Sequence, residues 1–129
     1  SVKPSRILPG FFSFESGYRT ARQLLHNDAS ITAIFCSSDD MAMGAIRYLK
    51  DEGLRVPDDI SVMGFDDVAF AAYTDPPLTT IRQPIREVGA GAARLLLRVL
   101  RKEARIPRRT ILDHEIVVRG SCRAPRQKA

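Results

Sequence analysis

The chain has 129 residues, of which 44% are hydrophobic and 27% charged, and its formal net charge is +5. This length suits one domain, and this apolar fraction can build a core, which excludes a wholly disordered chain. No apolar run reaches the roughly 18 residues of a membrane-spanning helix. The N-terminus starts without Met and has no signal-peptide pattern, so we expect a cut or processed end. Two cysteines are too few for a disulfide framework, which favours a reducing, cytoplasmic compartment.

Positive charge is concentrated near the C-terminus. Residues 101–129 hold nine Lys and Arg against three Asp and Glu, whereas residues 1–100 hold eleven against twelve. A basic stretch can bind the phosphates of a nucleic acid. No aromatic residues are interleaved for base stacking, so the pattern favours a solvated helix end followed by a basic tail at residues 123–129.

The first half of the chain alternates between predicted strands and helices. The apolar stretch 6–12 predicts a short strand interrupted near Pro9. Apolar residues at helical spacing predict a helix over 15–26. The continuous β-branched run 31–36, which includes Cys36, is typical of a strand buried on both faces of a parallel sheet. Ser37, Ser38 and Asp39 then supply helix-capping groups, and a helix over 41–50 follows them.

The second half continues this alternation. Residues 60–65 predict a second buried strand, and the loop after it holds one helical turn around 68–73. Pro84 stands at the first position of a strong amphipathic helix. Residues 111–118 predict a final strand. Together the elements predict an α/β fold with a doubly wound parallel sheet.

Three pairs of adjacent aspartates are candidate sites of chemistry, namely Asp39/Asp40, Asp58/Asp59 and Asp66/Asp67. In an open parallel sheet, ligands bind beyond the carboxyl ends of the strands. Asp39 and Asp66 each follow a predicted strand and therefore belong to that edge. Asp58 and Asp59 precede a strand, so we expect them to be turn residues at the opposite edge.

The pattern favours different roles for the two aspartates at the ligand-side edge. Asp39 opens a predicted helix and is interpreted as its cap. No long helix begins directly after Asp66, so a structural role and a contact to a hydroxyl-rich ligand are equally open.

Phe12 falls at a predicted strand end, where an aromatic ring can stack on a sugar or a base. The pattern alone nevertheless favours core positions for Phe12 and its neighbours Phe11 and Phe14.

The sequence does not favour an enzyme. His26 lies late in a predicted helix and His114 lies in the last predicted strand, and neither accompanies a nucleophile. The chain has no nucleophile elbow, phosphate-binding glycine loop or zinc-binding helix motif. We therefore expect no catalytic residues, no cofactor and no metal.

Four segments nevertheless carry a specific pattern. They are AIFCSSDDMAMGA at 33–45, GLRVPDDISVMGFDD at 53–67, PLTTIRQP at 77–84 and VVRGS at 117–121. In this order and spacing they resemble the LacI/GalR family of bacterial transcriptional regulators. The resemblance runs from about Phe12 to Ser121. It implies a periplasmic-binding-protein-like fold of type I, of which residues 1–122 form the C-terminal part, with the DNA-binding helix-turn-helix absent from this chain.

The resemblance also assigns roles to single residues. Asp66 matches the aspartate that hydrogen-bonds the effector, which is a sugar, a nucleoside or a purine. Phe12 matches the aromatic residue that stacks on it. Ser38 stands where many members have an Asn that contacts the ligand. Gln83 and Ile85 match positions that line the cleft.

Family members are homodimers or larger assemblies that bind operator DNA, here only through the absent domain. The residues that resemble the dimer-facing surface are Met43, Ala71, Tyr73 and Thr74. The resemblance further implies that the first strand of this subdomain lies upstream of Ser1 and that the helix from Pro84 crosses to another subdomain. We therefore expect an incomplete sheet, an uncovered helix 84–101 and self-association of the isolated chain.

Two alternatives remain beside the regulator. A periplasmic sugar-binding protein of a transport system would share the fold, although the run PPLTTIRQP makes it the weaker reading. A receiver domain would use Asp66 as its phosphoacceptor. It would also need a Lys after a late strand, and no such Lys is found at a predicted strand end.

Overall fold

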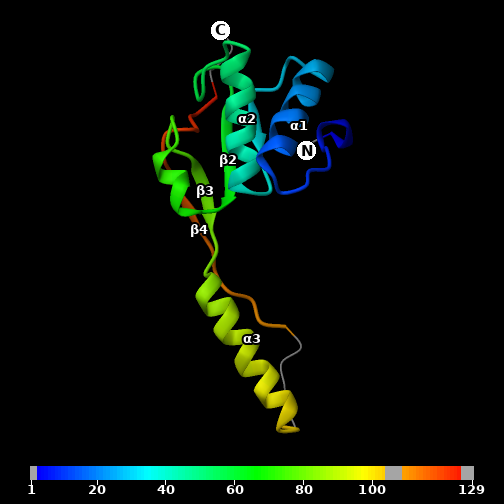
Figure 1. Cartoon of the computed structure of the whole chain (residues 1–129), viewed down its shortest axis with the longest axis vertical. Helices are drawn as coiled ribbons and strands as arrows, with labels where there is room; N and C mark the ends of the chain where they lie inside the picture. The colour runs from blue at the N-terminus through cyan, green and yellow to red at the C-terminus, as the bar shows by residue number, and fades with distance from the viewer. Residues whose placement is uncertain (1–2, 104–108, 126–129) are drawn as a thin grey trace.

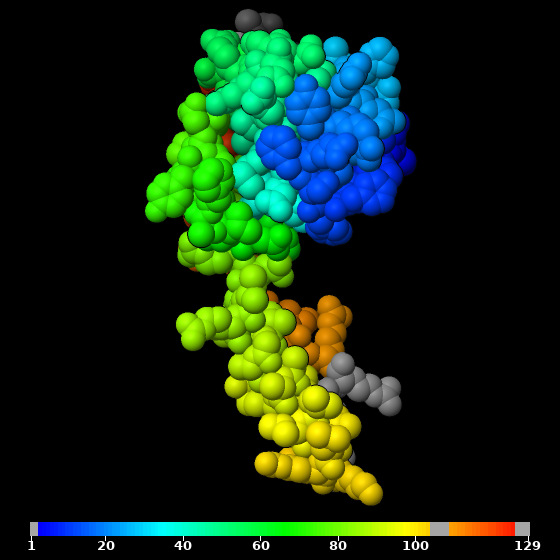
Figure 2. Space-filling model, in the orientation of Figure 1, coloured from blue at the N-terminus to red at the C-terminus, as the bar shows by residue number. Residues whose placement is uncertain are grey.

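The computed structural model describes residues 3–103 and 109–125, which form a body and an arm (Figure 1). The body contains a sheet and two helices, α1 (Phe14–Asn27) and α2 (Asp39–Asp51). The arm is the helix α3 (Ile85–Leu100) together with the chain that returns from it. Figure 2 shows the arm projecting from the body through a narrow waist.

The sheet has four strands in the order β1 (Ala33–Phe35), β2 (Ser61–Asp66), β3 (Thr79–Arg82) and β4 (Glu115–Val117). The first three strands are parallel, and β4 is antiparallel to β3. In register, Asp66 lies opposite Arg82, and Arg82 lies opposite Glu115. The expected α/β fold with a parallel sheet is therefore confirmed, with one antiparallel strand at its edge and with β4 shorter than predicted.

The predicted strand over 6–12 is wrong. Pro4–Arg6 form a short 3₁₀ helix, η1, and residues 7–11 have no regular structure. Two physical causes act together. Pro9 has no N–H to donate to a neighbouring strand. A groove of about 720 Å³ separates residues 6–8 from β1, so this segment also has no described strand to pair with.

The helices α1 and α2 begin at caps and pack closely. Ser13 and Ser16 form a capping box at the start of α1. At Gly44 of α2, an added Cβ would overlap the carbonyl oxygen of Phe14, so only glycine allows the two helices to approach this closely. α2 also packs against β2, which buries most of its apolar face, including Leu49.

The edge strand β1 is buried on one face, not on both as predicted. Ile34 points into the core, whereas Ala33 and Phe35 are exposed. Two buried faces require layers on both sides and a neighbour at each edge, and the described chain supplies only β2 beside β1. Cys36 is buried as expected.

The helix α3 is uncovered, as expected. Pro84 was predicted at the first position of the helix but is its N-cap, so the helix begins at Ile85. No residue of α3 is buried by the rest of the described chain. Its exposed apolar side chains are Ile85, Val88, Leu96, Leu97, Val99 and Leu100. Among the described residues, no helix is long and apolar enough to cross a membrane.

Candidate functional site

Three of the predicted ligand residues lie at one edge of the sheet. Ser38 follows β1, Asp66 ends β2 and Gln83 follows β3. Because these strands are parallel, their carboxyl ends meet at the same edge, where ligands bind in open α/β sheets. The expected placement of Asp66 at this edge is therefore confirmed.

Asp66 and Gln83 contact each other directly. The Gln83 amide nitrogen Nε2 donates a hydrogen bond to Asp66 Oδ1 at 2.7 Å. Asp66 is half-buried and has a backbone φ of +114°. Such a φ is uncommon for a residue with a side chain and is often found at functional sites. The structure thus joins a carboxylate and an amide, two groups that together can accept from and donate to ligand hydroxyls.

Ser38 has a structural role at this edge. It is the N-cap of α2, and its Oγ accepts a hydrogen bond from the backbone N–H of Met41 at 3.2 Å. The cap predicted at Asp39 is therefore wrong, and α2 begins two residues earlier than expected because Ser38 provides the cap. The side chain of Ser38 is buried, and its contact to a ligand stays a prediction.

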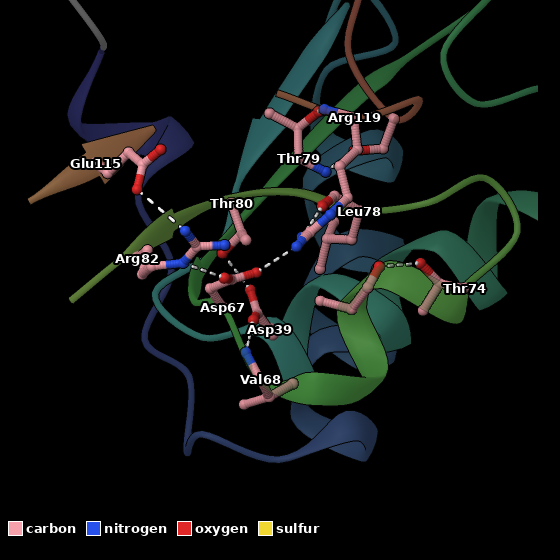
Figure 3. A network of polar contacts seen from close by, with 12 residues as sticks. Asp39, Asp67, Val68, Thr74, Leu78, Thr79, Thr80, Arg82, Glu115 and Arg119 are labelled. Carbon is pink, nitrogen blue, oxygen red and sulfur yellow. Dashed lines mark hydrogen bonds and ion pairs between the residues drawn. The ribbon is translucent and has the colours of Figure 1, made fainter. Parts of the chain in front are cut away.

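Asp39 ties three elements together from the first turn of α2. Its fully buried carboxylate accepts from Thr80 Oγ1 at 2.5 Å and from the Val68 backbone N–H at 2.8 Å (Figure 3). A Cβ at Gly64 would collide with this carboxylate, so glycine makes room for it. Burial raises the pKa of Asp39, and its two hydrogen bonds oppose that shift. The Asp39 carboxylate therefore holds α2, β3 and the segment at Val68 together at the ligand-side edge of the sheet.

Phe12 is exposed at the start of α1. It is 67% exposed, has a φ of +52° and directly precedes the cap Ser13. Phe11 and Phe14 are exposed too, so the core positions favoured by the pattern are wrong. A free ring face at Phe12 fits the stacking role that the resemblance implies, which stays a prediction.

Sequence reasoning missed a charged cluster around Asp67. Its Oδ2 accepts from Arg82 Nε and its Oδ1 from Arg119 Nη2, each at 2.6 Å (Figure 3). Burial alone would raise the pKa of Asp67, but the two guanidinium groups lower it overall. Arg82 ends the strand beside β2, so the order of strands could have indicated that its guanidinium lies near the aspartate pair. Arg119 is 52 residues away from Asp67, and nothing in the sequence indicated that the two side chains meet.

The four predicted dimer residues differ in what they offer a partner. Tyr73 is strongly exposed, whereas Met43 and Thr74 are half-buried. Ala71 belongs to the 3₁₀ helix η2 (Ala69–Tyr73) and is fully buried in the core, so it has no surface to offer a partner. The dimer surface therefore stays a prediction for Met43, Tyr73 and Thr74.

The opposite edge of the sheet confirms the turn residues. Asp59 accepts from the Arg55 backbone N–H at 2.9 Å, and Asp58 pairs with Arg123 at 2.6 Å. Arg123 begins the predicted basic tail and is thus held by an acidic residue of the body, and residues 126–129 lie outside the described residues. The pair of Asp58 with Arg123 gives this one C-terminal charge a structural partner.

Other features of the described chain lie apart from this edge. The groove beside β1 is lined by neither Phe12, Ser38, Asp66 nor Gln83. Residues 3–103 and 109–125 contain no cluster of His, Cys, Asp and Glu that could hold a metal ion.

Known proteins with similar sequences are transcriptional regulators. A family model described as a periplasmic binding protein-like domain matches residues 5–122. The HTH-type transcriptional repressor CytR of Escherichia coli K12 is 43% identical over 123 residues, which make up 95% of this chain and 36% of the repressor. The chain thus spans little more than a third of the length of this relative.

Solved structures agree with these relatives. The transcriptional regulator CelR in complex with cellobiose has a TM-score of 0.88 and 35% identity, over 94% of this chain and 37% of its own. The lac repressor dimer bound to operator and the anti-inducer ONPF has a TM-score of 0.81 and 35% identity, over 89% and 40%. These proteins are regulators and not enzymes, transport components or receivers. The chain therefore belongs to the family of periplasmic binding protein-like domains, in the form found in transcriptional regulators of the LacI type.

Proposed function

We propose that this chain is the C-terminal part of the effector-binding and dimerisation domain of a LacI/GalR-type transcriptional regulator. Residues 1–122 form this part and residues 123–129 a basic tail. The intact regulator acts in the cytoplasm and binds operator DNA through a separate helix-turn-helix domain. The chain acts by allostery: a small polar effector binds at the edge of the sheet and biases two states of a dimer.

One observation carries this proposal. Asp66 and Gln83 are hydrogen-bonded at the carboxyl ends of two parallel strands, and Gln83 begins the short segment that leads into the arm. A ligand that contacts this pair touches both the body and the root of the arm. Such a position can convert binding into a change of orientation between two regions.

The chemistry of the site indicates the class of effector. A carboxylate accepts hydroxyl or amino protons, an amide both donates and accepts, and an exposed aromatic ring can cover an apolar sugar face or a base. Phe12, Ser38, Asp66 and Gln83 together suit a sugar, a nucleoside or a purine. CelR, which is similar over most of this chain, was solved with cellobiose.

The test uses the full-length regulator and its own operator. A thermal-shift panel of pentoses, disaccharides, nucleosides and purines first identifies an effector. Asp66→Ala is then expected to abolish the effect of that compound on operator binding while leaving operator binding itself intact. Asp66→Asn keeps the shape and tolerates the positive φ, so it separates loss of charge from backbone strain.

The matched control is Asp58→Ala, which removes a carboxylate at the opposite edge of the sheet. It is expected to retain the effector response. A regulator that still responds to its effector with Asp66→Ala and Asp66→Asn would show that the site assignment is wrong.

A further inference from the structure

A single buried carboxylate lies behind the ligand-side edge of the sheet. The Asp39 side chain is fully buried, and its two oxygens accept hydrogen bonds from two different segments (Figure 3). Oδ1 accepts from the hydroxyl of Thr80 in β3, and Oδ2 accepts from the backbone N–H of Val68 after β2. All three residues belong to the body, and a further part of the protein that packs on the body cannot uncover them. The contacts of Asp39 are therefore independent of the arm.

Each segment joined in this way carries one predicted ligand residue within three positions of the contact. These residues are Ser38 beside Asp39, Asp66 near Val68 and Gln83 near Thr80. The three segments come from α2, from the end of β2 and from β3. One carboxylate thus ties together the three parts of the chain on which the candidate site is built.

The link to Val68 acts on an uncommon backbone. Asp66 and Asp67 both have a positive φ, +114° and +55°. This conformation costs free energy in a residue with a side chain, so it persists only where surrounding contacts determine it. The hydrogen bond from Val68, which directly follows these two residues, is such a contact. It helps to fix the direction in which Asp66 leaves β2, and Asp66 Oδ1 there accepts from Gln83 Nε2 at 2.7 Å.

The link to Thr80 acts on the neighbouring strand. In register, Thr80 of β3 lies opposite Gly64 of β2. A Cβ at Gly64 would overlap Asp39 Oδ1, so the missing side chain lets the carboxylate reach across β2 to β3. The Thr80 side chain is fully buried, and its hydroxyl would be left without a partner if the carboxylate were removed. Asp39 therefore holds β3 beside β2 close to their carboxyl ends.

The hydrogen bonds of Asp39, rather than its charge, fit this role. Burial raises the pKa of Asp39, its two hydrogen bonds lower it, and the nearby charges of Asp66 and Asp67 raise it again. The negative charge is thus unfavourable by itself and is stabilised by the two donors. A side chain that keeps both hydrogen bonds without the charge should therefore preserve the role.

We propose that Asp39 is a positioning residue of the effector site: by holding Thr80 and the Val68 N–H, it fixes the ends of β2 and β3 so that Gln83 meets Asp66. Asp39 touches no effector, because its side chain is fully buried. The expected effect on effector affinity rests on the proposed function, whereas the contact between Asp66 and Gln83 does not.

Two pairs of variants of the full-length regulator separate the hydrogen bonds from shape and charge. Asp39→Leu keeps a branched side chain but accepts no hydrogen bond. Asp39→Asn can accept from Val68 and donate to the Thr80 hydroxyl, which accepts as well as donates. Thr80→Val removes the hydroxyl of Thr80, and Thr80→Ser keeps it.

The matched control is Ser121→Ala, which removes another fully buried hydroxyl between β2 and β3. Ser121 Oγ donates to the Val62 carbonyl at 2.6 Å and accepts from the Thr79 backbone N–H at 2.8 Å. These contacts lie near the starts of the two strands, away from the ligand-side edge. The control therefore destabilises the same strands without touching the candidate site.

The first measurement contains no effector. Proton–nitrogen NMR follows the side-chain amide signal of Gln83, which is assigned by its absence in Gln83→Glu. We expect this signal to shift and its protons to exchange faster in Asp39→Leu and Thr80→Val, because the hydrogen bond to Asp66 is lost. The signal should keep its parent position in Asp39→Asn, Thr80→Ser and Ser121→Ala.

The second measurement adds a probe. Isothermal titration calorimetry gives the affinity of each variant for ribose, cellobiose, adenosine and adenine. For each probe that the parent binds, Asp39→Leu should weaken binding about tenfold or more, because a displaced Asp66 or Gln83 loses a hydrogen bond to the probe. Thr80→Val should weaken it by a smaller factor, and Asp39→Asn, Thr80→Ser and Ser121→Ala should bind like the parent.

The first measurement decides the proposal even when no probe binds, and circular dichroism verifies that each variant is folded. A folded Asp39→Leu with the parent Gln83 signal would overturn the proposal, and so would an equal shift of this signal in Ser121→Ala. If Asp39→Leu does not fold, an unchanged signal in Thr80→Val would overturn it instead. A shifted Gln83 signal with unchanged probe affinity supports the positioning role and contradicts the assignment of Asp66 and Gln83 to the effector.

Discussion

The body and the arm contain similar helices in opposite surroundings. Both α2 and α3 are amphipathic by sequence, and both begin next to the carboxyl end of a strand. α2 buries eight residues against α1 and the sheet, whereas α3 buries none against the described chain. An apolar stripe thus identifies the face of a helix that needs a cover, but it does not say which part of the protein provides that cover.

The largest expected contrast between body and arm comes from removing one leucine in each. Leu49 in α2 is fully buried, and Leu96 in α3 is 59% exposed. Leu49→Ala should lower the free energy of unfolding by about 2–5 kcal/mol, because it leaves a cavity in the core. Leu96→Ala should change it by less than about 0.5 kcal/mol. Urea unfolding of the chain at a concentration where light scattering gives the monomer mass measures both.

Raising the protein concentration sharpens this test. If the uncovered face of α3 mediates the self-association that we expect, the cost of Leu96→Ala should grow with concentration while that of Leu49→Ala stays constant. A light-scattering mass of a well-behaved monomer at all concentrations would contradict self-association. Equal costs for the two variants in the monomer would contradict the contrast itself.

A smaller contrast, with opposite signs, is expected for two glycines. Gly44→Ala in α2 pushes a methyl group into the backbone of α1 and should destabilise the body by about 1–3 kcal/mol. Gly89→Ala in α3 meets no described atom within 4 Å and should stabilise the arm helix by about 0.5–1 kcal/mol. Amide hydrogen exchange reports the two helices separately. Slower exchange in α2 of Gly44→Ala would refute the close approach of α1 and α2.

The smallest expected effect is the pH dependence of the junction between the two regions. The pKa of Asp67 is lowered in the folded chain, so its ion pairs stabilise the fold above the ordinary carboxyl value of 3.8 and this contribution is lost as the pH falls below it. The difference in unfolding free energy between the parent chain and Asp67→Asn should be largest at neutral pH and should shrink as the pH falls below 3.8. Urea unfolding across pH measures it.

Leu96→Ala is the control for this pH series, because it removes no titratable group. Its difference from the parent chain should stay constant across the same range. A difference for Asp67→Asn that persists undiminished in acid would mean that shape and not charge explains the role of Asp67.

The order of elements in the body could be predicted from sequence because local signals agree there. The apolar run 60–65 predicts a strand, and the capping residues before Met41 predict a helix start, each within two residues of the observed element. The strand predicted over 6–12 failed because a strand is defined by its neighbour, and composition carries no information about whether a neighbour is present. The prediction that β1 is buried on both faces was wrong for the same reason.

The site was predictable in part. Asp66 ends one parallel strand and Gln83 follows the next, so topology alone brings them to one edge, and the resemblance supplied their roles. The contacts of Asp39 and Asp67 were not predictable, because their partners Thr80 and Arg119 are 41 and 52 residues away. A carboxylate at a strand end shows that a partner is required, but only the folded chain shows which residue it is.

The register of β3 and β4 gives the arm a simple topological description. Arg82 and Glu115 lie directly opposite each other in an antiparallel pair, so the strands on either side of the arm are those of a β-hairpin. Residues 83–114 are then an insertion into the turn of that hairpin. A two-residue Asn-Gly turn, which matches the twist of antiparallel strands, would be sufficient to close it. Residues 83–114, which begin with the ligand residue Gln83, therefore leave the sheet and return to it at one point, so the two connections between the arm and the body lie side by side.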